Sequence, residues 1–176
     1  VSEKITGNFH KPKNFELILS GDISADIFSK NIDVAYSNQL IEHISPDDVF
    51  DQLQGIYNAL VAGGAYICIT PHRFAGPHDI SAYFDDVAAG FHLKEYTNKE
   101  LYHLFKAVGF SKIESFLNLG VAYIKFPIYP VIIVEYLLSL FPRAVRKYIS
   151  KTLLFRSILG IRIAAIKQDR NYKSII

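Results

Sequence analysis

Two stretches decide the fold: Asp33-Val-Ala-Tyr-Ser-Asn-Gln-Leu-Ile-Glu-His43 and Leu60-Val-Ala-Gly-Gly-Ala-Tyr-Ile-Cys-Ile-Thr-Pro-His72. Together they predict a strand, a polar loop, a helix, a Gly-Gly turn and a second strand. The predicted strands, 32–37 and 65–70, are nearly continuous apolar runs, which are typical of parallel strands covered on both faces. Sheets of this kind bind ligands at the carboxyl ends of neighbouring strands, so the polar residues after each strand are candidate site residues.

Helices and strands alternate along most of the chain. A helix is expected to begin at Ser45-Pro46, because a hydroxyl cap followed by proline is a strong helix start, and to stop at Gly63-Gly64. A second helix is expected from the capping box Thr97–Glu100 to Gly109. The segment 72–96 is read as a long loop, with or without one helical turn. Further strands are expected at 15–20, 110–117 and 161–167. This alternation predicts an α/β fold.

The segment 118–159 is predicted to be a helical insertion or lid within a single domain, 1–176. Prolines at 127 and 130 precede an expected helix at 131–141, and a second helix is expected from Pro142 to Gly160. Lys125, Glu135 and the prolines interrupt the apolar stretch 117–141, which leaves it short of the roughly 20 residues of a membrane span. A membrane span, an interfacial helical pair with a basic rim, and packing against the sheet all stay open.

Composition sets the broad class. Half of the 176 residues are hydrophobic, which is enough for one packed domain. A net charge of +2 without a basic run predicts no nucleic-acid partner, and the single cysteine, Cys68, predicts a buried thiol in a cytoplasmic protein. Residues 1–14 lack the apolar region of a signal peptide. Because the chain contains no methionine and starts at Val1, we expect a fragment or a misplaced gene start.

Five short segments carry a family resemblance: Leu40-Ile-Glu-His43, 60–64, Ile69-Thr-Pro-His72, 92–97 and 107–110. In order and spacing they resemble the class I S-adenosylmethionine-dependent methyltransferases of the methyltransferase type 11 subgroup. The pattern departs at Ala62, where the family has proline, and at Val61, where it has a basic residue. The resemblance covers 15–116 and 161–167. It implies a partial Rossmann-like sheet with strands three to seven of the family order three, two, one, four, five, seven, six, and helices on both faces.

The resemblance also implies S-adenosylmethionine as cofactor and assigns its contacts. Asp22 would accept a bond from the adenine amino group, Ile23 would meet the ring, and the sulfonium would lie beside Ser37, Asn38 and Gln39. The simpler interpretations are that Asp22 is a turn residue and that Asn38 and Gln39 are solvated loop residues.

Two histidines are the candidate catalytic residues. A hydroxyl acceptor needs a general base, and neutral histidine is the usual choice, so His43 and then His92 are the candidates; alternatively His43 packs under the following helix. The spacing of His72, His78, His92 and Asp79 matches no standard zinc pattern, so no metal is predicted.

The family's glycine-rich cofactor loop and its acidic ribose-binding residue are both missing before Phe15, and Gly63-Gly64 precedes a strand instead of following one. We therefore expect the C-terminal portion of a methyltransferase that lacks the first two strands and binds the cofactor poorly. The expected function is methyl transfer to a small-molecule, saccharide or lipid-linked acceptor, as a truncated or inactive fragment. The alternative is a non-catalytic methyltransferase-like module that docks on a membrane surface or a partner through its apolar, basic tail.

Overall fold

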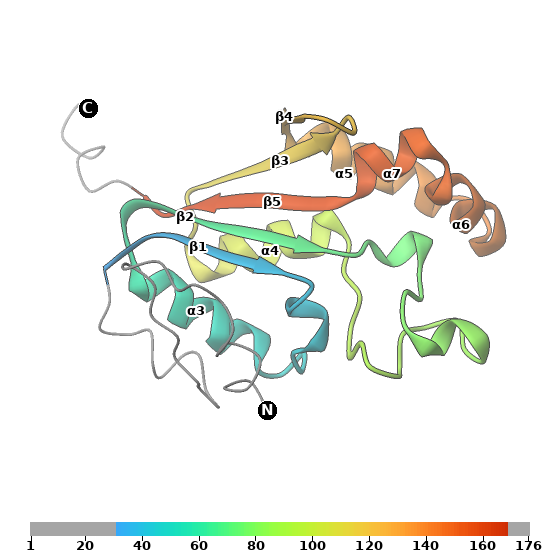
Figure 1. Cartoon of the computed structure of the whole chain (residues 1–176), viewed down its shortest axis with the longest axis horizontal. Helices are drawn as coiled ribbons and strands as arrows, with labels where there is room; N and C mark the ends of the chain where they lie inside the picture. Colours follow the sequence, from blue (N-terminus) through green and yellow to red (C-terminus); the bar gives the residue numbers. More distant parts are fainter. Residues whose placement is uncertain (1–30, 169–176) are drawn as a thin grey trace, which may run out of the picture.

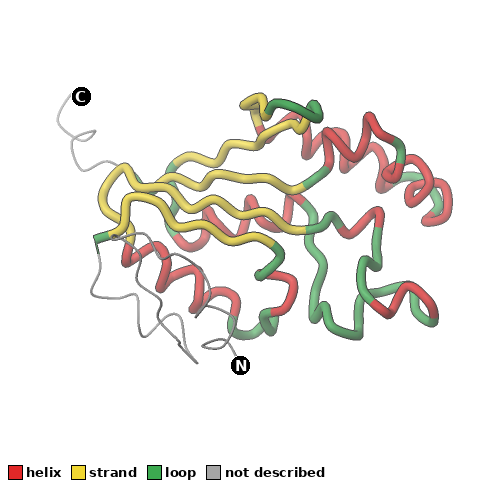
Figure 2. The backbone as a smooth tube through the Cα atoms, viewed as in Figure 1, coloured by secondary structure: helices red, strands yellow, loops and turns green. Residues whose placement is uncertain are grey.

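A five-stranded mixed sheet forms the centre of the protein. The computed structural model describes residues 31–168, and its strands lie in the order β1-β2-β5-β3-β4 (Figures 1 and 2). Their bounds are β1 Ile32–Asn38, β2 Leu60–Thr70, β3 Lys112–Asn118, β4 Tyr123–Pro127 and β5 Ile161–Ile166. Strands β1 and β2 are parallel, and the other pairs are antiparallel. The α/β class is confirmed, and β1-β2-β5-β3 has the order four, five, seven, six that the resemblance implies. The strand expected at 15–20 lies outside the described residues.

One face of the sheet carries the core. Helices α3 (Val49–Ala59) and α4 (Asn98–Val108) pack there, and α5 (Ile128–Ser139) joins them. Cys68 is fully buried in this core, and burial raises the pKa of its thiol to about 12. The predicted role as a structural thiol fits this position. On the opposite face of β1, Val34 and Tyr36 are more than half exposed, so only one of the two expected helical layers lies within 31–168.

Local signals placed α4 correctly and α3 less well. The capping box of Thr97 and Glu100 is present, and α4 ends at Gly109, which has a left-handed φ of 117°. At the start of α3, however, Ser45 accepts a bond from Asp47 N at 3.3 Å and introduces a turn, and the α-helix itself begins at Val49. The Ser-Pro signal therefore marks the turn that precedes the helix.

The predicted role of Gly63-Gly64 is wrong. Helix α3 ends at Ala59, and both glycines lie inside β2, at a bulge between the pairs Ile32–Leu60 and Val34–Ala65. Gly63 has a left-handed φ of 80°. A Cβ on Gly64 would lie 2.9 Å from the carbonyl oxygen of Val61 and 3.1 Å from that of Asp33. The glycines are thus required by the fit of β2 against β1 and do not cap the helix.

The segment 118–159 contains a strand as well as helices. Strand β4 forms an antiparallel hairpin with β3, which the sequence analysis did not predict. Helix α5 follows at once, and the second predicted helix is broken at Thr152 into α6 (Arg143–Lys151) and α7 (Leu153–Leu159). Figure 1 shows α6 and α7 beyond the edge where β1 and β2 end. Within residues 31–168 no helix combines the length and apolar character that a membrane crossing requires. The expected cytoplasmic location with peripheral membrane contact stays a prediction.

Candidate functional site

The carboxyl ends of β1 and β2 open onto a cavity of about 660 Å³. Because β5 runs antiparallel to β2 and pairs Ile161 with Thr70, the amino end of β5 lines the same cavity. Gln39, the first residue after β1, has a left-handed φ of 52°, and its amide donates to the Ile69 carbonyl at 2.8 Å. A non-glycine residue held in this region costs about 1–2 kcal/mol, and such strain clusters at functional sites.

Of the predicted cofactor residues, some are accessible at the end of β1 and one is buried. Asn38 is exposed at the end of β1, and Gln39 lines the cavity. Ser37 is buried, and its hydroxyl lies 2.6 Å from that of Tyr66 inside the core. Burial raises the pKa of Tyr66 well above its usual value, so this pair stays neutral. The side chain of Ser37 is therefore unavailable to a ligand, while Asp22 and Ile23 lie outside the described residues.

The two predicted catalytic histidines lie together although they are far apart in sequence. His43 ends the short 3-10 helix η1 (Ile41–His43), and the amides of Leu93 and Lys94 donate to the Glu42 carbonyl at 2.7 and 3.2 Å. These backbone bonds bring the ring of His92 edge-to-face with that of His43, with 4.9 Å between centroids. The pairing of the two chain segments, and not the interior of a helix or strand, brings the histidines together. Neither of them is among the residues that line the 660 Å³ cavity.

Hydrogen bonds fix which nitrogen of each neutral ring carries the hydrogen. Nδ1 of His43 lies 2.9 Å from the Phe91 carbonyl, and Nδ1 of His92 lies 2.9 Å from Oε1 of Glu95. Both partners can only accept, so each Nδ1 carries the hydrogen and each neutral ring keeps its lone pair on Nε2. An Nε2 lone pair can take a proton or bind a metal ion.

Two buried carboxylates, which the sequence analysis missed, support the histidines. Burial acts to raise the pKa of Glu95, but the hydrogen bonds from His78 and His92 outweigh it and leave that pKa below its usual value. Glu95 therefore stays charged beside His92. Glu42 is completely buried. One of its oxygens accepts from Thr70 Oγ1 at 2.7 Å, and the other has no hydrogen-bond partner among the described residues.

Glu42, His43 and His92 could together hold a divalent cation. One ligand atom from each lies within 4.8 Å of the other two, and two imidazoles with one carboxylate suit several transition metals. This set shares only His92 with the group of three histidines and Asp79 whose spacing matches no standard zinc pattern. It could not be found by spacing alone, because His92 approaches the Glu-His pair only through the fold.

The loop between β2 and α4 positions His92. It is the long loop that was expected, and it contains two short 3-10 helices, η2 (Arg73–Ala75) and η3 (Ile80–Tyr83). Desolvation acts to raise the pKa of Asp79, but its bonds from the amides of His92 and Ser81 hold that pKa at about 2. Asp79 is thus a charged anchor for the backbone of His92 and not a metal ligand.

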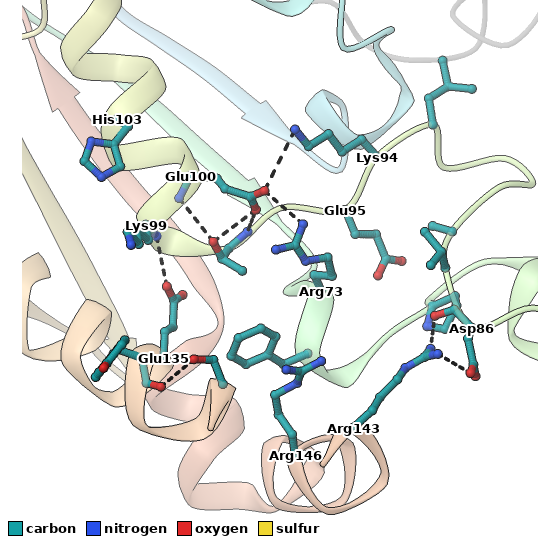
Figure 3. A pocket seen from close by; sticks show the side chains of 18 residues that line it. Arg73, Asp86, Lys94, Glu95, Lys99, Glu100, His103, Glu135, Arg143 and Arg146 are labelled. Atoms are coloured by element: carbon teal, nitrogen blue, oxygen red, sulfur yellow. Dashed lines mark hydrogen bonds and ion pairs between the residues drawn. The ribbon is translucent and has the colours of Figure 1, made fainter. Parts of the chain in front are cut away.

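A second cavity, of about 740 Å³, lies between this loop, the start of α4 and helices α5 and α6 (Figure 3). Two of its three arginines are paired with acids. Arg73 lies 3.0 Å from Glu100, and Arg143 contacts Asp86. Arg146 stacks over the ring of Phe74, 4.5 Å from its centroid. Since its cations and anions are matched, this cavity has little excess charge.

Comparisons with known proteins give only distant likenesses. No protein-family model matches the chain, and no curated protein matches it. Several solved structures are similar, including two methyltransferases. A SAM-dependent methyltransferase from Archaeoglobus fulgidus matches with a TM-score of 0.47 and 18% identity over 84% of this chain. Phosphoethanolamine N-methyltransferase 2 from Haemonchus contortus, in complex with phosphomonomethylethanolamine and S-adenosylhomocysteine, matches with a TM-score of 0.44 and 20% identity over 81%.

The chain spans 65% of the first of these proteins and 35% of the second. With TM-scores below 0.5, neither likeness decides the function of this chain.

Proposed function

We propose that the chain takes part in methyl transfer from S-adenosylmethionine, with the acceptor bound over the carboxyl ends of β1 and β2. The observation that carries the proposal is the pair His43 and His92, whose Nδ1 atoms are both committed to acceptors, leaving Nε2 of each ring for chemistry. Either Nε2 could remove the proton of an acceptor hydroxyl. The acceptor is a small molecule, a saccharide or a lipid-linked compound, and no nucleic-acid partner is proposed.

The residues at the end of β1 fit one side of the cofactor. Asn38 is exposed and Gln39 lines the cavity, so both amide side chains are available for hydrogen bonds. When bound, the cofactor supplies an electrophilic methyl group, and the chain's own contribution is to hold the acceptor in line with it. The sequence offers no glycine-rich loop after a strand for the methionine end. We therefore propose weak cofactor binding by this chain alone.

Saturation-transfer NMR with S-adenosylhomocysteine tests this proposal, because the method detects weak binding. We expect transfer to the adenosyl protons that is reduced in a double variant, Asn38→Ala with Gln39→Gly. Gln54→Ala is the matched control and should leave the transfer unchanged, because this amide on α3 bonds to Asn58 and does not line the cavity. No transfer at millimolar ligand, or equal transfer in the double variant, would refute the cofactor proposal. Submicromolar affinity would instead show that the glycine-rich loop is unnecessary.

A second candidate function is docking on a membrane or a partner protein through the tail. The observation that favours it is a group of large apolar side chains on α5, α6 and α7 that are about half exposed or more: Tyr129, Ile133, Tyr136, Leu137, Leu140, Tyr148, Leu153 and Leu154. Exposed apolar patches of this kind mark interaction sites. The neighbouring cations of α6 would add attraction to anionic lipids.

Co-sedimentation with anionic liposomes tests the docking function. Leu153→Ser with Leu154→Ser should abolish sedimentation, whereas Tyr83→Ser, an equally exposed residue on η3, should not. Binding should weaken as salt is added, because part of it is electrostatic. Wild-type protein that stays in the supernatant at low salt would rule out membrane docking. Point variants are preferable to deletion of 118–159, since that deletion would remove β4 and the buried side chains of α5.

A further inference from the structure

The cavity at the carboxyl edge of the sheet has an unbalanced positive charge. Lys151, Arg156 and Arg162 line it, together with two histidines, and no carboxylate among the described residues does. Within 31–168 none of these three cations takes part in an ion pair. The larger cavity is different, because four carboxylates line it and two of its arginines, Arg73 and Arg143, are paired with acids. The positive charge of the smaller cavity is therefore the less compensated of the two.

A buried hydroxyl without a partner lines the same cavity. Ser150, the penultimate residue of α6, is 2% exposed, and its Oγ makes no hydrogen bond to any residue in 31–168. Buried hydroxyls are normally satisfied, so an orphaned one beside a cavity points to a ligand atom as its missing partner. This observation is independent of the charge, because Ser150 contributes none.

Arg162 is held in place from the sheet. Its guanidinium lies 5.9 Å from the centroid of the Tyr123 ring, and Nη1 is 3.4 Å from the Gly160 carbonyl. Burial lowers the pKa of Arg162 although Tyr123 acts in the opposite direction. Gly160 makes room for this arrangement, since a Cβ there would lie 2.6 Å from Nη1. A preorganised guanidinium loses little freedom when it binds a planar pair of oxygens.

We propose that this cavity binds a phosphate group, with Arg156, Arg162 and Lys151 as cationic donors and Ser150 Oγ as a neutral one. We infer further that this phosphate is part of the methyl acceptor, and this second step rests on the proposed function. Phosphate suits the site because several charged donors converge on one cavity, and arginine forks match its oxygens. The exposed side chains of Leu153 and Leu154 follow directly in sequence and could contact a hydrocarbon chain on the same molecule.

Titration with inorganic phosphate, against chloride at matched ionic strength, tests the site without cofactor or acceptor. The arginine Nε–H signals of ¹⁵N-labelled full chain are observed, and we expect saturable shifts for Arg156 and Arg162. Arg162→Gln should weaken binding about tenfold or more, and Ser150→Ala about fivefold, by loss of a charged and a neutral hydrogen bond respectively. Lys147→Gln removes a charge from the same helix outside the cavity and should leave the affinity unchanged.

Shifts that do not saturate, or equal affinity in Arg162→Gln and wild type, would overturn the proposal. Gly160→Ala is a second variant in case Arg162→Gln fails to fold, because it keeps every charge but displaces the guanidinium; unchanged phosphate affinity in this variant would also count against the site. A chain that binds phosphate but not S-adenosylhomocysteine would leave the anion site standing and remove only its link to methyl transfer.

A vesicle-binding experiment tells whether the phosphate belongs to a lipid or to a soluble phosphate ester. Phosphatidylcholine vesicles with and without phosphatidic acid are compared for wild type and Arg162→Gln. Binding to phosphatidic acid that Arg162→Gln abolishes supports the site and assigns a lipid phosphate to it. Saturable binding of inorganic phosphate without vesicle binding supports the site and assigns a soluble phosphate ester. Absence of both contradicts the proposal.

Discussion

The carboxylate of Glu135, in the interior of α5, accepts a hydrogen bond from Nε2 of His72 at 2.7 Å. It also accepts bonds from the side chain and amide of Asn98 and from the amide of Lys99. One buried side chain thus joins the loop that follows β2, the first turn of α4 and the middle of α5. Because the amides at a helix start carry partial positive charge, the carboxylate is well placed to accept from them.

Glu135→Gln should destabilise the fold by about 2–4 kcal/mol, since it replaces a buried charged acceptor of four bonds by a neutral group that also brings two donors. The measurement is urea unfolding followed by circular dichroism. Asp33→Asn, an exposed acid on β1, is the control and should change stability by less than about 0.5 kcal/mol. If Glu135→Gln lowers the free energy of unfolding no more than the control does, the four hydrogen bonds to Glu135 do not stabilise the fold.

The same residue predicts a pH dependence. Burial acts to raise the pKa of Glu135, but the bond from His72 and those from Asn98 and Lys99 leave it below the usual value. A carboxyl with a lowered pKa stabilises the fold above the pKa of the unfolded chain and loses that contribution as pH falls. Wild type should therefore lose more stability than Glu135→Gln between about pH 5 and pH 3. Parallel curves of unfolding free energy against pH would contradict this prediction.

The tautomers of His43 and His92 can be observed directly. Long-range ¹H–¹⁵N NMR at alkaline pH should show both neutral rings protonated on Nδ1, because the Phe91 carbonyl and the Glu95 carboxylate accept there. Glu95→Ala should release His92 to a mixture of tautomers and leave His43 unchanged. If His92 keeps a single tautomer in that variant, Glu95 does not orient it.

Gly64→Ala should destabilise the sheet by about 1–3 kcal/mol, in the range of overpacked sites. The new Cβ would press on the backbone oxygens of Val61 and Asp33, which cannot move without disturbing the pairing of β1 with β2. Thermal unfolding measures the loss, with Ala62→Gly, an exposed neighbour in the same bulge, as comparison. Equal stability of Gly64→Ala and wild type would mean that the bulge relaxes freely.

Elements with strong local signals could be predicted from the sequence, and those decided by distant pairing could not. Thr97, Glu100 and Gly109 specify both ends of α4 through contacts within a few residues. Gly63 and Gly64 suit either a helix cap or a bulge, and the choice is made by β1, about thirty residues away. Strand β4 has five residues and a central lysine, so only its pairing with β3 identifies it.

The candidate site divides in the same way. His43 and His92 were found because each belongs to a short motif. Glu42 and Glu95 were missed, since a buried acid has no local pattern that separates it from an exposed one. Ser37 points into the core because its position in β1 places its side chain on the same face of the sheet as Tyr66. The residues around Ser37 in the sequence do not reveal which face that is.

The antiparallel direction of β5 has an evolutionary consequence. Thr70 and Ile161 are partners across β2 and β5, so the point where one strand leaves the sheet adjoins the point where the chain returns to it. Whatever sequence is inserted before β5 is thereby delivered to the rim of the smaller cavity. Relatives could exchange or lengthen α6 and α7, and so reshape that cavity, while the strands beneath stay as they are.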